Sequence, residues 1–387
     1  MLSTRALRAV PVVALAFALG GCSGPTSLPP CETPTLDEFA PDHGVLFGVN
    51  PDWANQSLQE FGQALGEEPA VAVSFVDFPL RETDKENLTA AAHQVQRTGG
   101  TLLLTLEPKG GLNTVTAESV DDLADVLEPV EAAGTAVVVR FAHEMNGSWY
   151  AWGQQPEAYI QAFRTVGSGL RDSLDATSMM WAPNYAGGYP FAGGAFEAKH
   201  GTADFVALDT NGDGIVAVTD DPYAPYYPGD DVVDWVGMSL YHWGSAHPWG
   251  ENELPEDGKF VAQLTGHYRG LAGDDSAVPD FYAEYGEKRQ KLVAIPETAA
   301  LVVNRGDPAG ESAIKQAWWR QIFASDIPEL FPQLKMINWF EWHKFEPEVR
   351  GDVDWTITSD RAVSRAFAAD LPEWVRFAKQ RASCTPV

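Results

Sequence analysis

The sequence predicts an α/β fold, a TIM (β/α)8 barrel with one long insertion after its fifth strand. Short runs rich in Val, Leu, Ile and Ala alternate with longer amphipathic segments between residues 45 and 340. Strands that alternate with helices in this way form parallel βαβ units. The alternation accounts for eight strands, and the 387 residues of the chain lie within the range of about 200 to more than 400 residues that such barrels cover.

The helices between the strands are marked by their ends. Pro156 stands in the first turn of one expected helix, and Gly99 and Gly100 end another. The apolar runs suit strands that are buried on both faces of a parallel sheet. The expected strands cover residues 45–49, 70–75, 101–106, 134–139, 177–182, 234–239, 292–296 and 335–340, and the clearest helices cover residues 56–65, 87–97, 120–133 and 156–174. One domain at residues 43–384 accommodates all of them, with residues 185–231 as the insertion.

The composition is that of a globular protein with a strongly negative charge. Hydrophobic residues make up 45% of the chain and aromatic residues 11%, which is enough for a large core. The 26 Lys and Arg against 54 Asp and Glu give a formal charge of −28. Because the basic residues do not cluster along the sequence, we expect no nucleic-acid partner. We also expect a monomer.

The amino terminus resembles a bacterial lipoprotein signal. Two arginines precede an apolar run, and residues 19–22, LGGC, resemble a lipobox. We expect a signal peptide at residues 1–21, a lipid on Cys22 and a Ser/Pro-rich tether at residues 22–42. The protein would then be exported and anchored at the cell surface through this lipid only, since two acyl chains can hold a protein on a membrane. The alternative is an ordinary secretory peptide with an incidental cysteine.

Two further cysteines flank the predicted barrel. Cys31 precedes the first strand, and Cys384 follows the last helix. An even pair of cysteines in an exported protein indicates a disulfide, and domain termini often lie close together. The alternative is two free thiols near the ends of the chain.

A carboxylate stands at the carboxyl end of the fourth expected strand. Glu144 follows the β-branched run at residues 134–139, and two tryptophans and a tyrosine follow it within one loop. Reacting groups in a TIM barrel lie at the carboxyl ends of the strands, and flat aromatic rings beside a carboxylate suit the apolar faces of sugars. The alternative is an ordinary loop carboxylate that pairs with Arg140 or His143.

These residues resemble the acid/base strand of glycoside hydrolase family 26, a family of (β/α)8 barrels that includes β-mannanases. In that family a histidine precedes the catalytic glutamate, Asn-Gly follows shortly after it, and a substrate-binding tryptophan comes five residues on. The resemblance implies that Glu144 is the general acid/base. It also implies that His143, Asn146 and Trp149 bind the substrate.

A second carboxylate ends the seventh expected strand. Glu297 follows the apolar residues 292–296 and precedes a threonine and an alanine, which resembles the nucleophile segment of the family. Strands four and seven would direct Glu144 and Glu297 across one cleft. Two carboxyls about 5–5.5 Å apart carry out retaining hydrolysis. The alternative for Glu297 is an ion-paired residue at a strand end.

Further site residues are implied by the same resemblance. Tyr241 resembles the tyrosine that hydrogen-bonds the nucleophile, and Trp339 resembles the tryptophan that forms the floor of the sugar site. Trp243, Trp152 and Tyr150 are further candidates for stacking on a sugar; the alternative is that they pack at the rim of the barrel. Ser239 stands where family members often carry Asp, so the sugar contacts differ from those of a strict mannanase. Glu341 is a third carboxylate at a strand end, and its candidate role is that of a structural partner of His143 or Arg140.

The insertion carries a calcium-loop pattern. Residues 209–220 read DTNGDGIVAVTD, which is the spacing D-x-N-x-D-G-x5-D of an EF-hand loop with Asp in place of Glu at the last position. The expected Ca²⁺ ligands are the side chains of Asp209, Asn211, Asp213 and Asp220 and the carbonyl of Ile215. The alternative is a solvated turn rich in Gly and Asp.

Together these patterns predict a lipid-anchored retaining endo-β-glycanase that hydrolyses a β-linked polysaccharide. The family resemblance puts β-mannan first, with mixed-linkage β-glucan or β-xylan next. The alternative is a carbohydrate-binding lipoprotein on a barrel that has lost activity, but the presence of both Glu144 and Glu297 favours the enzyme.

Overall fold

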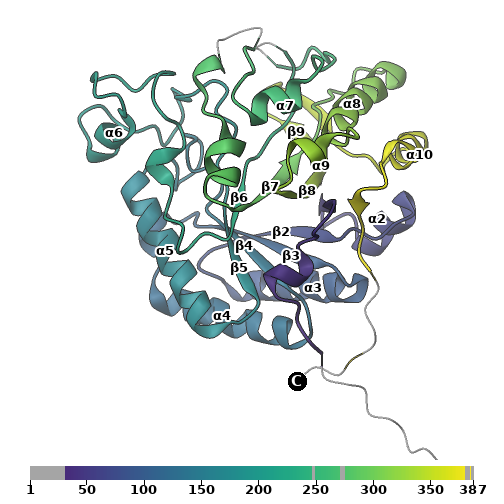
Figure 1. The fold of residues 1–387 in the computed structure, drawn as a ribbon, viewed down its shortest axis with the longest axis horizontal. Coiled ribbons are helices and arrows are strands. Elements are labelled where there is room, and N and C mark those ends of the chain that lie inside the picture. The colour runs from purple at the N-terminus through teal and green to yellow at the C-terminus, as the bar shows by residue number, and fades with distance from the viewer. Residues whose placement is uncertain (1–30, 246–248, 271–274, 380–383, 385–387) are drawn as a thin grey trace, which may run out of the picture.

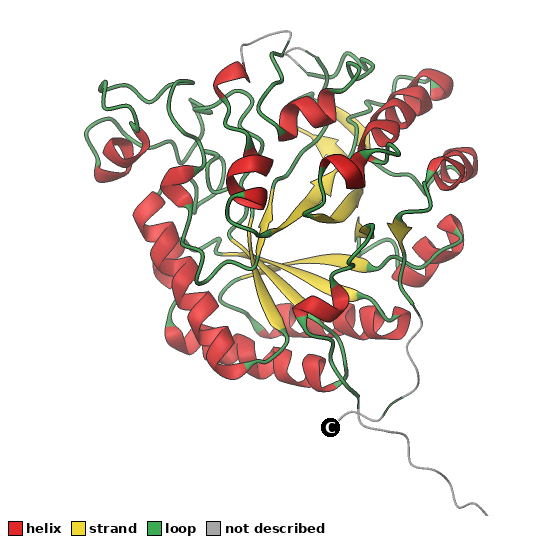
Figure 2. Ribbon diagram, in the orientation of Figure 1, coloured by secondary structure: helices red, strands yellow, loops and turns green. Residues whose placement is uncertain are grey.

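Eight parallel strands close into a barrel, and helices cover its outside (Figures 1 and 2). The computed structural model describes residues 31–245, 249–270, 275–379 and 384, so the expected signal peptide and Cys22 lie outside the described residues. Neighbours along the chain pair in the order β1 to β8, and β1 pairs with β8 through six residue pairs from Leu46 with Met336 to Pro51 with Glu341. The expected TIM barrel is confirmed.

The strands agree closely with those expected from the sequence. The main differences are that β6 is shorter than expected and that β7 continues past its proline to include Glu297. The strands are β1 (Val45–Pro51), β2 (Val71–Asp77), β3 (Thr101–Glu107), β4 (Val137–Phe141), β5 (Thr177–Trp181), β6 (Trp235–Gly237), β7 (Leu292–Thr298) and β8 (Leu334–Glu341).

Six longer helices pack on the outside of the barrel, and shorter ones lie in the loops. The longer helices are α2 (Leu58–Leu65), α3 (Glu82–Thr98), α4 (Ala117–Ala132), α5 (Pro156–Ser173), α8 (Pro308–Ile322) and α10 (Arg361–Asp370). The shorter ones are α1 (Leu36–Phe39), α6 (Ala203–Leu208), α7 (Lys259–Leu264), α9 (Ile327–Leu330), the 3₁₀ turns η1 (Leu112–Thr114), η2 (Ala224–Tyr226) and η3 (Asp275–Ala277), and the π-helix η4 (Tyr282–Glu287).

Three short strands follow β8 or flank β1. The antiparallel hairpin of β9 (His343–Glu346) and β10 (Gly351–Asp354) stands beyond the end of β8, and β11 (Val375–Arg376) pairs with the start of β1. Within the described part of the chain, no helix is both long enough and apolar enough to cross a bilayer.

Two apolar layers result from the alternation of side chains along the strands. One small cluster fills the barrel interior and includes Val73, Leu103, Val138 and Met336. A larger cluster lies between the strands and the outer helices. Because successive side chains of a strand point to opposite faces, each strand contributes to both layers. This parity decides which strand-end residues can face the barrel axis.

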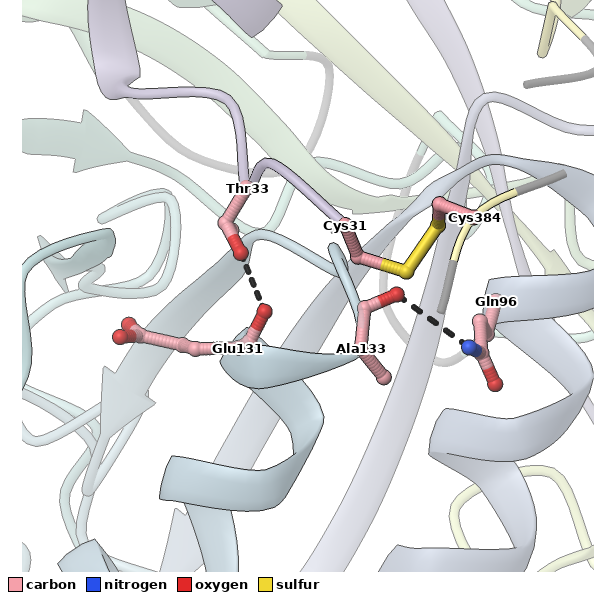
Figure 3. The surroundings of a disulfide bond; sticks show 6 residues. All are labelled: Cys31, Thr33, Gln96, Glu131, Ala133 and Cys384. Carbon is pink, nitrogen blue, oxygen red and sulfur yellow. Dashed lines mark hydrogen bonds between the residues drawn. A yellow bond between two sulfur atoms is a disulfide. The ribbon is translucent and has the colours of Figure 1, made fainter. Parts of the chain in front are cut away.

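The segment before β1 covers the end of the barrel at which the strands begin. Phe39 of α1 stacks on Trp235 of the interior cluster, with ring centroids 6.0 Å apart. Cys31, at the start of this segment, forms the expected disulfide with Cys384 (Figure 3). The hydroxyl of Thr33 donates to the carbonyl oxygen of Glu131 at the end of α4, which holds the segment against the helical layer (Figure 3).

We expect Cys384→Ser to lower the stability of the mature domain by about 2–5 kcal/mol, since a disulfide restricts the unfolded chain. The bond closes a loop with a sequence separation of 353 residues, so its removal frees a long stretch of unfolded chain. Urea unfolding of the variant and of the unreduced protein measures the difference. Thiol labelling of the denatured, unreduced protein should find Cys31 and Cys384 blocked; two reactive thiols would contradict the expectation.

Candidate active site

Arg140 on β4 is the buried centre of the site. It alternates with the interior residue Val138, so its side chain points into the barrel, where it is completely buried. One end of its guanidinium donates to the carboxylate of Glu297, and the other donates to the hydroxyl of Ser239 at 2.7 Å. The cation therefore links the ends of β4, β6 and β7.

Glu297 reaches the barrel axis because of a bulge in β7. Ile295 pairs with Ile337 of β8, but the next matched pair is Thr298 with Trp339, so β7 contains one extra residue here. The bulge reverses the alternation and turns Glu297 inward, whereas Thr298 points outward and accepts a hydrogen bond from Trp318 of α8 at 3.0 Å.

The carboxylate of Glu297 is held by two donors. Arg140 donates to one oxygen, and the hydroxyl of Tyr241 donates to the other at 2.7 Å. Burial and the nearby carboxylates raise the pKa of Tyr241 well above its usual range, so the phenol keeps the proton that it donates. Charge-assisted hydrogen bonds of this kind favour an ionised acceptor. The structure thus places Tyr241 where the sequence analysis expects it.

Glu144 lies just beyond β4 in an unusual backbone conformation. Ala142 and Glu144 have φ angles of 46° and 55°, in the left-handed region that few non-glycine residues occupy. The Glu144 N–H donates to the carbonyl oxygen of Ala182 after β5 at 2.9 Å, which fixes this bend. The indole N–H of Trp149 donates to the Glu144 carboxyl at 3.2 Å. Strained residues of this kind cluster at functional sites.

Burial raises the pKa of Glu144 to about 7, and repulsion from the charge of Glu297 adds to the effect. The cation of Arg140 and hydrogen bonds from Ser239 and Trp149 oppose the rise. Glu144 therefore keeps its proton up to about pH 7, whereas the neighbouring carboxylate of Glu297 accepts hydrogen bonds from two donors. Such a division of roles between two carboxyls is what an acid and a nucleophile require.

The other residues expected around Glu144 differ in their access to the cleft. Trp149 is 38% exposed and can contact a ligand. His143 is buried, with its ring 5.4 Å from that of Phe75 and 5.0 Å from that of Tyr150. Burial and the charge of Arg140 lower the pKa of His143 well below its usual range, so the ring is neutral.

Asn146 is also buried and exchanges two hydrogen bonds with the backbone of Asn184, both at 2.9 Å. It joins the loops after β4 and β5.

Aromatic rings pack around Tyr241 at the edge of the cleft. Trp243 is partly exposed, and its ring centroid lies 6.4 Å from that of Tyr241. Phe340 lies 5.8 Å from Tyr241 and stacks on Trp342, while Trp355 lies 5.4 Å from Tyr241. Phe340, Trp342 and Trp355 were not predicted to lie here, because nothing in their spacing shows that the segments at Trp342 and Trp355 fold back toward Tyr241.

The expected role of Trp339 as the floor of the sugar site is wrong. This side chain is 0% exposed. Its ring lies 6.5 Å from Trp319 of α8 and 5.8 Å from Phe367 of α10. Strand alternation explains the difference, since Trp339 points toward the helices and the next residue, Phe340, points toward Tyr241.

Glu341 is a structural residue, but it does not pair with the fourth strand. Its two carboxylate oxygens accept hydrogen bonds from the backbone N–H groups of Ile357 and Thr358, at 2.7 and 2.8 Å. These bonds hold the segment that carries Trp355. Burial raises the pKa of Glu341 to about 7.

The expected calcium loop forms a compact turn in the insertion. Asp209 accepts hydrogen bonds from the N–H groups of Asp213 and Gly214, at 3.0 and 2.7 Å. Asp220 accepts from the N–H groups of Asn211 and Ala217, at 3.1 and 2.8 Å. Over the described ranges, no three His, Cys, Asp or Glu side chains are grouped so that they could hold a metal ion. In this arrangement the carboxylates serve backbone amides, and the residues do not fit a calcium site without rearrangement.

Comparison with known protein families agrees with this geometry. Residues 102–271 match the model of glycosyl hydrolase family 26. The matched segment contains Arg140, Glu144 and Tyr241, and it ends before Glu297. The family resemblance of the sequence is therefore confirmed for this segment, whereas the place of Glu297 in the site rests on its contacts.

Curated relatives match about half of the chain. This chain is 25% identical to Endoglucanase H of Acetivibrio thermocellus over 217 residues, which is 54% of this chain and 20% of that protein. It is 26% identical to Beta-1,3-xylanase TXYA of a Vibrio species over 216 residues, which is 53% of this chain and 39% of that protein. The chain thus spans less than half of the length of these relatives.

Solved structures share the fold over most of the chain. A modular endo-beta-1,4-mannanase from Cellulomonas fimi covers 93% of this chain and 82% of its own, with 16% identity and a TM-score of 0.57. The GH26C structure from Muricauda sp. MAR_2010_75 covers 87% of both chains, with 14% identity and a TM-score of 0.57. Both comparisons extend the likeness in fold beyond the matched segment.

Proposed function

From the match of residues 102–271 to glycosyl hydrolase family 26, we propose that this protein is a retaining endo-β-glycanase. The observation that carries the proposal is the pairing of Glu144, whose pKa burial raises to about 7, with a Glu297 held by Arg140 and Tyr241. Two carboxyls in these states, beside exposed aromatic rings, suit the hydrolysis of a glycosidic bond. A protein that only binds sugars has no need for this electrostatic arrangement.

The mechanism proceeds through two displacements. Glu297 attacks the anomeric carbon while Glu144 gives its proton to the glycosidic oxygen, so the C–O bond breaks and the leaving sugar departs as an alcohol. The ester that forms removes the negative charge of Glu297, which lowers the pKa of Glu144. Glu144 then takes a proton from a water molecule, the water oxygen attacks the same carbon, and Glu297 is released as a carboxylate. The anomeric carbon thus regains its original configuration, and both carboxyl groups return to their starting protonation states.

Arg140 and Tyr241 position the nucleophile during this cycle. Their donors aim at different oxygens of Glu297, so the carboxylate cannot rotate freely. Removing Arg140 would leave the buried carboxylate of Glu297 without its cationic partner, which is strongly unfavourable. The same donors can stabilise the carboxylate when it is expelled in the second step.

We propose β-mannan as the substrate, with mixed-linkage β-glucan and β-xylan as the next choices. The resemblance of the sequence around Glu144 to β-mannanases supports mannan, while the names of the curated relatives support glucan and β-1,3-xylan. Ser239 stands where family members often carry Asp and binds Arg140, so the panel must include glucan and xylan as well as mannan. A panel of soluble β-glycans, with reducing ends measured, tests the proposal. If no β-glycan in the panel released reducing ends, the proposal would be contradicted.

We also propose that the mature protein is a lipoprotein of the cell surface. The sequence LGGC at residues 19–22 supports a lipid on Cys22, and the tether would leave the barrel free to meet a polysaccharide outside the cell. Mass spectrometry of the protein from a bacterial membrane fraction tests this. An amino-terminal peptide that lacks a lipid on Cys22 would contradict it.

Calcium binding by the insertion remains a proposal that rests on its sequence. If Asp209, Asn211, Asp213 and Asp220 turn inward to bind one Ca²⁺, the ion stabilises the folded state by mass action, by about 2.7 kcal/mol at a hundredfold excess over Kd. We expect a chelator to lower the melting temperature of the wild type but not of Asp213→Ala. An unchanged melting temperature and metal content after chelation would show that the loop is only a turn.

A further inference from the structure

A cavity opens from the catalytic cleft beside β6. Its volume is about 240 Å³, and its lining includes Ser239 and Tyr241 of the catalytic site and the aromatic rings of Tyr185 and Trp243. Pockets for drug-sized ligands measure about 300–1,000 Å³. This smaller cavity therefore has room for a single sugar residue, with two rings against which an apolar sugar face can stack.

The short helix α7 presents two buried polar side chains to this cavity. Lys259 and Gln263 stand four residues apart, so they lie on the same face of the helix. They are 3% and 4% exposed, and both line the cavity. The side-chain oxygen of Gln263 is buried, and it has no hydrogen-bond partner among the described residues. A buried acceptor without a donor is unfavourable, unless a ligand supplies the donor.

Lys259, in contrast, is fully engaged by the protein. Its ammonium donates to the carbonyl oxygen of Gly244 at 2.8 Å and lies 3.2 Å from the carboxylate of Glu256. It thereby fixes the end of α7 against the loop after β6. The free acceptor of Gln263 is then held in a defined position.

The charges around the cavity select a neutral ligand. One ammonium, that of Lys259, lies in the field of three carboxylates, those of Glu253, Glu256 and Asp275. The ring of His242 adds no charge near neutral pH, because burial and the charge of Lys259 lower its pKa to about 4. Like charges repel, so a uronate or a sulfated sugar would be disfavoured. An acceptor oxygen and aromatic walls suit a hydroxyl-rich neutral sugar.

The position of the cavity indicates which sugar it receives. Its wall includes Tyr241, which binds Glu297, and Asn184, whose backbone exchanges two hydrogen bonds with Asn146, two residues after Glu144. The cavity therefore extends from the nucleophile toward the loop that carries the acid. The acid gives its proton to the oxygen that departs with the leaving sugar. The sugar on the Glu144 side of the broken bond is therefore the one nearest the cavity.

We propose that this cavity binds the neutral sugar residue on the leaving-group side of the scissile bond, and that Gln263 accepts a hydrogen bond from one of its hydroxyls. The inference rests on the proposed glycanase function, because it assigns a place to a sugar of the same substrate. It makes Gln263 a specificity-determining residue that neither the sequence pattern around Glu144 nor the strand ends reveal.

The test uses Gln263→Met, which keeps the length of the side chain and removes the acceptor. On β-mannohexaose we expect kcat/KM to fall about tenfold, the equivalent of one hydrogen bond to a hydroxyl. On nitrophenyl β-mannobioside, whose leaving group is not a sugar, we expect kcat/KM to stay within twofold of the wild type. Gln263→Glu keeps an acceptor oxygen and should recover part of the loss on the hexasaccharide.

Two controls keep the outcomes separate. Gln161→Met makes the same change at an exposed position of α5 and should leave kcat/KM on both substrates unchanged. Circular dichroism shows whether each variant is folded.

If the glycan panel selects a glucan or xylan, the corresponding oligosaccharide and aryl glycoside replace the mannosides. A wild type that cleaves no β-glycan contradicts the proposed function. An active wild type with equal losses on both substrates, or with no loss in a folded Gln263→Met protein, overturns the inference about the cavity.

Discussion

Replacement of Glu297 by alanine should reduce kcat on a β-glycan by a factor on the order of 10⁴ or more, because the attacking group of the first displacement is removed. Arg140 and Tyr241 would remain around a small empty space where the carboxylate stood. Azide can enter such a space, attack the anomeric carbon once and leave an α-glycosyl azide. Activity should thus return in part with azide on a substrate that has a good leaving group, and the product should have the inverted configuration.

Glu341→Ala is the matched control for this result. Glu341 is also a buried carboxylate at the end of a strand, but its oxygens hold the backbone of Ile357 and Thr358. Its loss should disturb the segment that carries Trp355, and azide should restore nothing. If azide rescued both variants, or if Glu297→Ala kept normal turnover, the assignment of the nucleophile would be wrong.

Glu144→Ala should lose about 10²- to 10⁴-fold in kcat on polysaccharide, which is the usual contribution of a general acid/base. Substrates with good leaving groups need no proton for the first step, so they should form the glycosyl-enzyme rapidly and hydrolyse it slowly. Mass spectrometry should detect this intermediate on Glu297. Added azide should release it as a β-glycosyl azide.

The pH dependence of the wild type follows from the state of Glu144. The first step requires its protonated form, and its pKa is raised from 4.5 to about 7 by burial and by the charge of Glu297. Activity on polysaccharide should therefore persist up to about pH 7 and fall about tenfold per pH unit above it. In Glu144→Ala, with an activated aryl glycoside, this alkaline limb should be absent. An unchanged alkaline limb in the variant would mean that another group titrates there.

The barrel was predictable because its local signals agree with one another. Each strand is a short apolar run, Gly99 ends α3, and Pro156 begins α5, so the order of elements can be read along the chain. Glu144 was also predictable, since it stands close to the end of a strand, and Tyr241 was predicted from its resemblance to a family tyrosine. The ends of parallel strands meet at one edge of a barrel whatever the details of packing.

The rest of the site depends on features that no single segment contains. Trp339 was predicted to lie in the cleft because it resembles the family tryptophan of the sugar site, but the parity of β8 turns it toward α8 and α10. Glu297 faces inward only because of the bulge in β7, and that extra residue becomes visible when β7 is paired with β8. Gln263 lies on a short helix, and its free acceptor emerges only from the packing around it.

The partners of Arg140 could not be predicted from the sequence either. In the sequence it stands four residues before Glu144, which suggests a local ion pair. The structure instead joins it to Glu297 and Ser239, which are distant along the chain. Long-range partners of a buried charge follow from the closure of the barrel, which brings β4 and β7 to a common axis.

The configuration of the first product tests the two-carboxyl account most directly. The wild-type enzyme is mixed with a soluble oligosaccharide of its preferred β-glycan, and proton NMR follows the anomeric signals before mutarotation mixes them. The account predicts that the β-anomer appears first, because two displacements at one carbon restore its configuration. Initial formation of the α-anomer would contradict it and would remove Glu297 from the role of nucleophile.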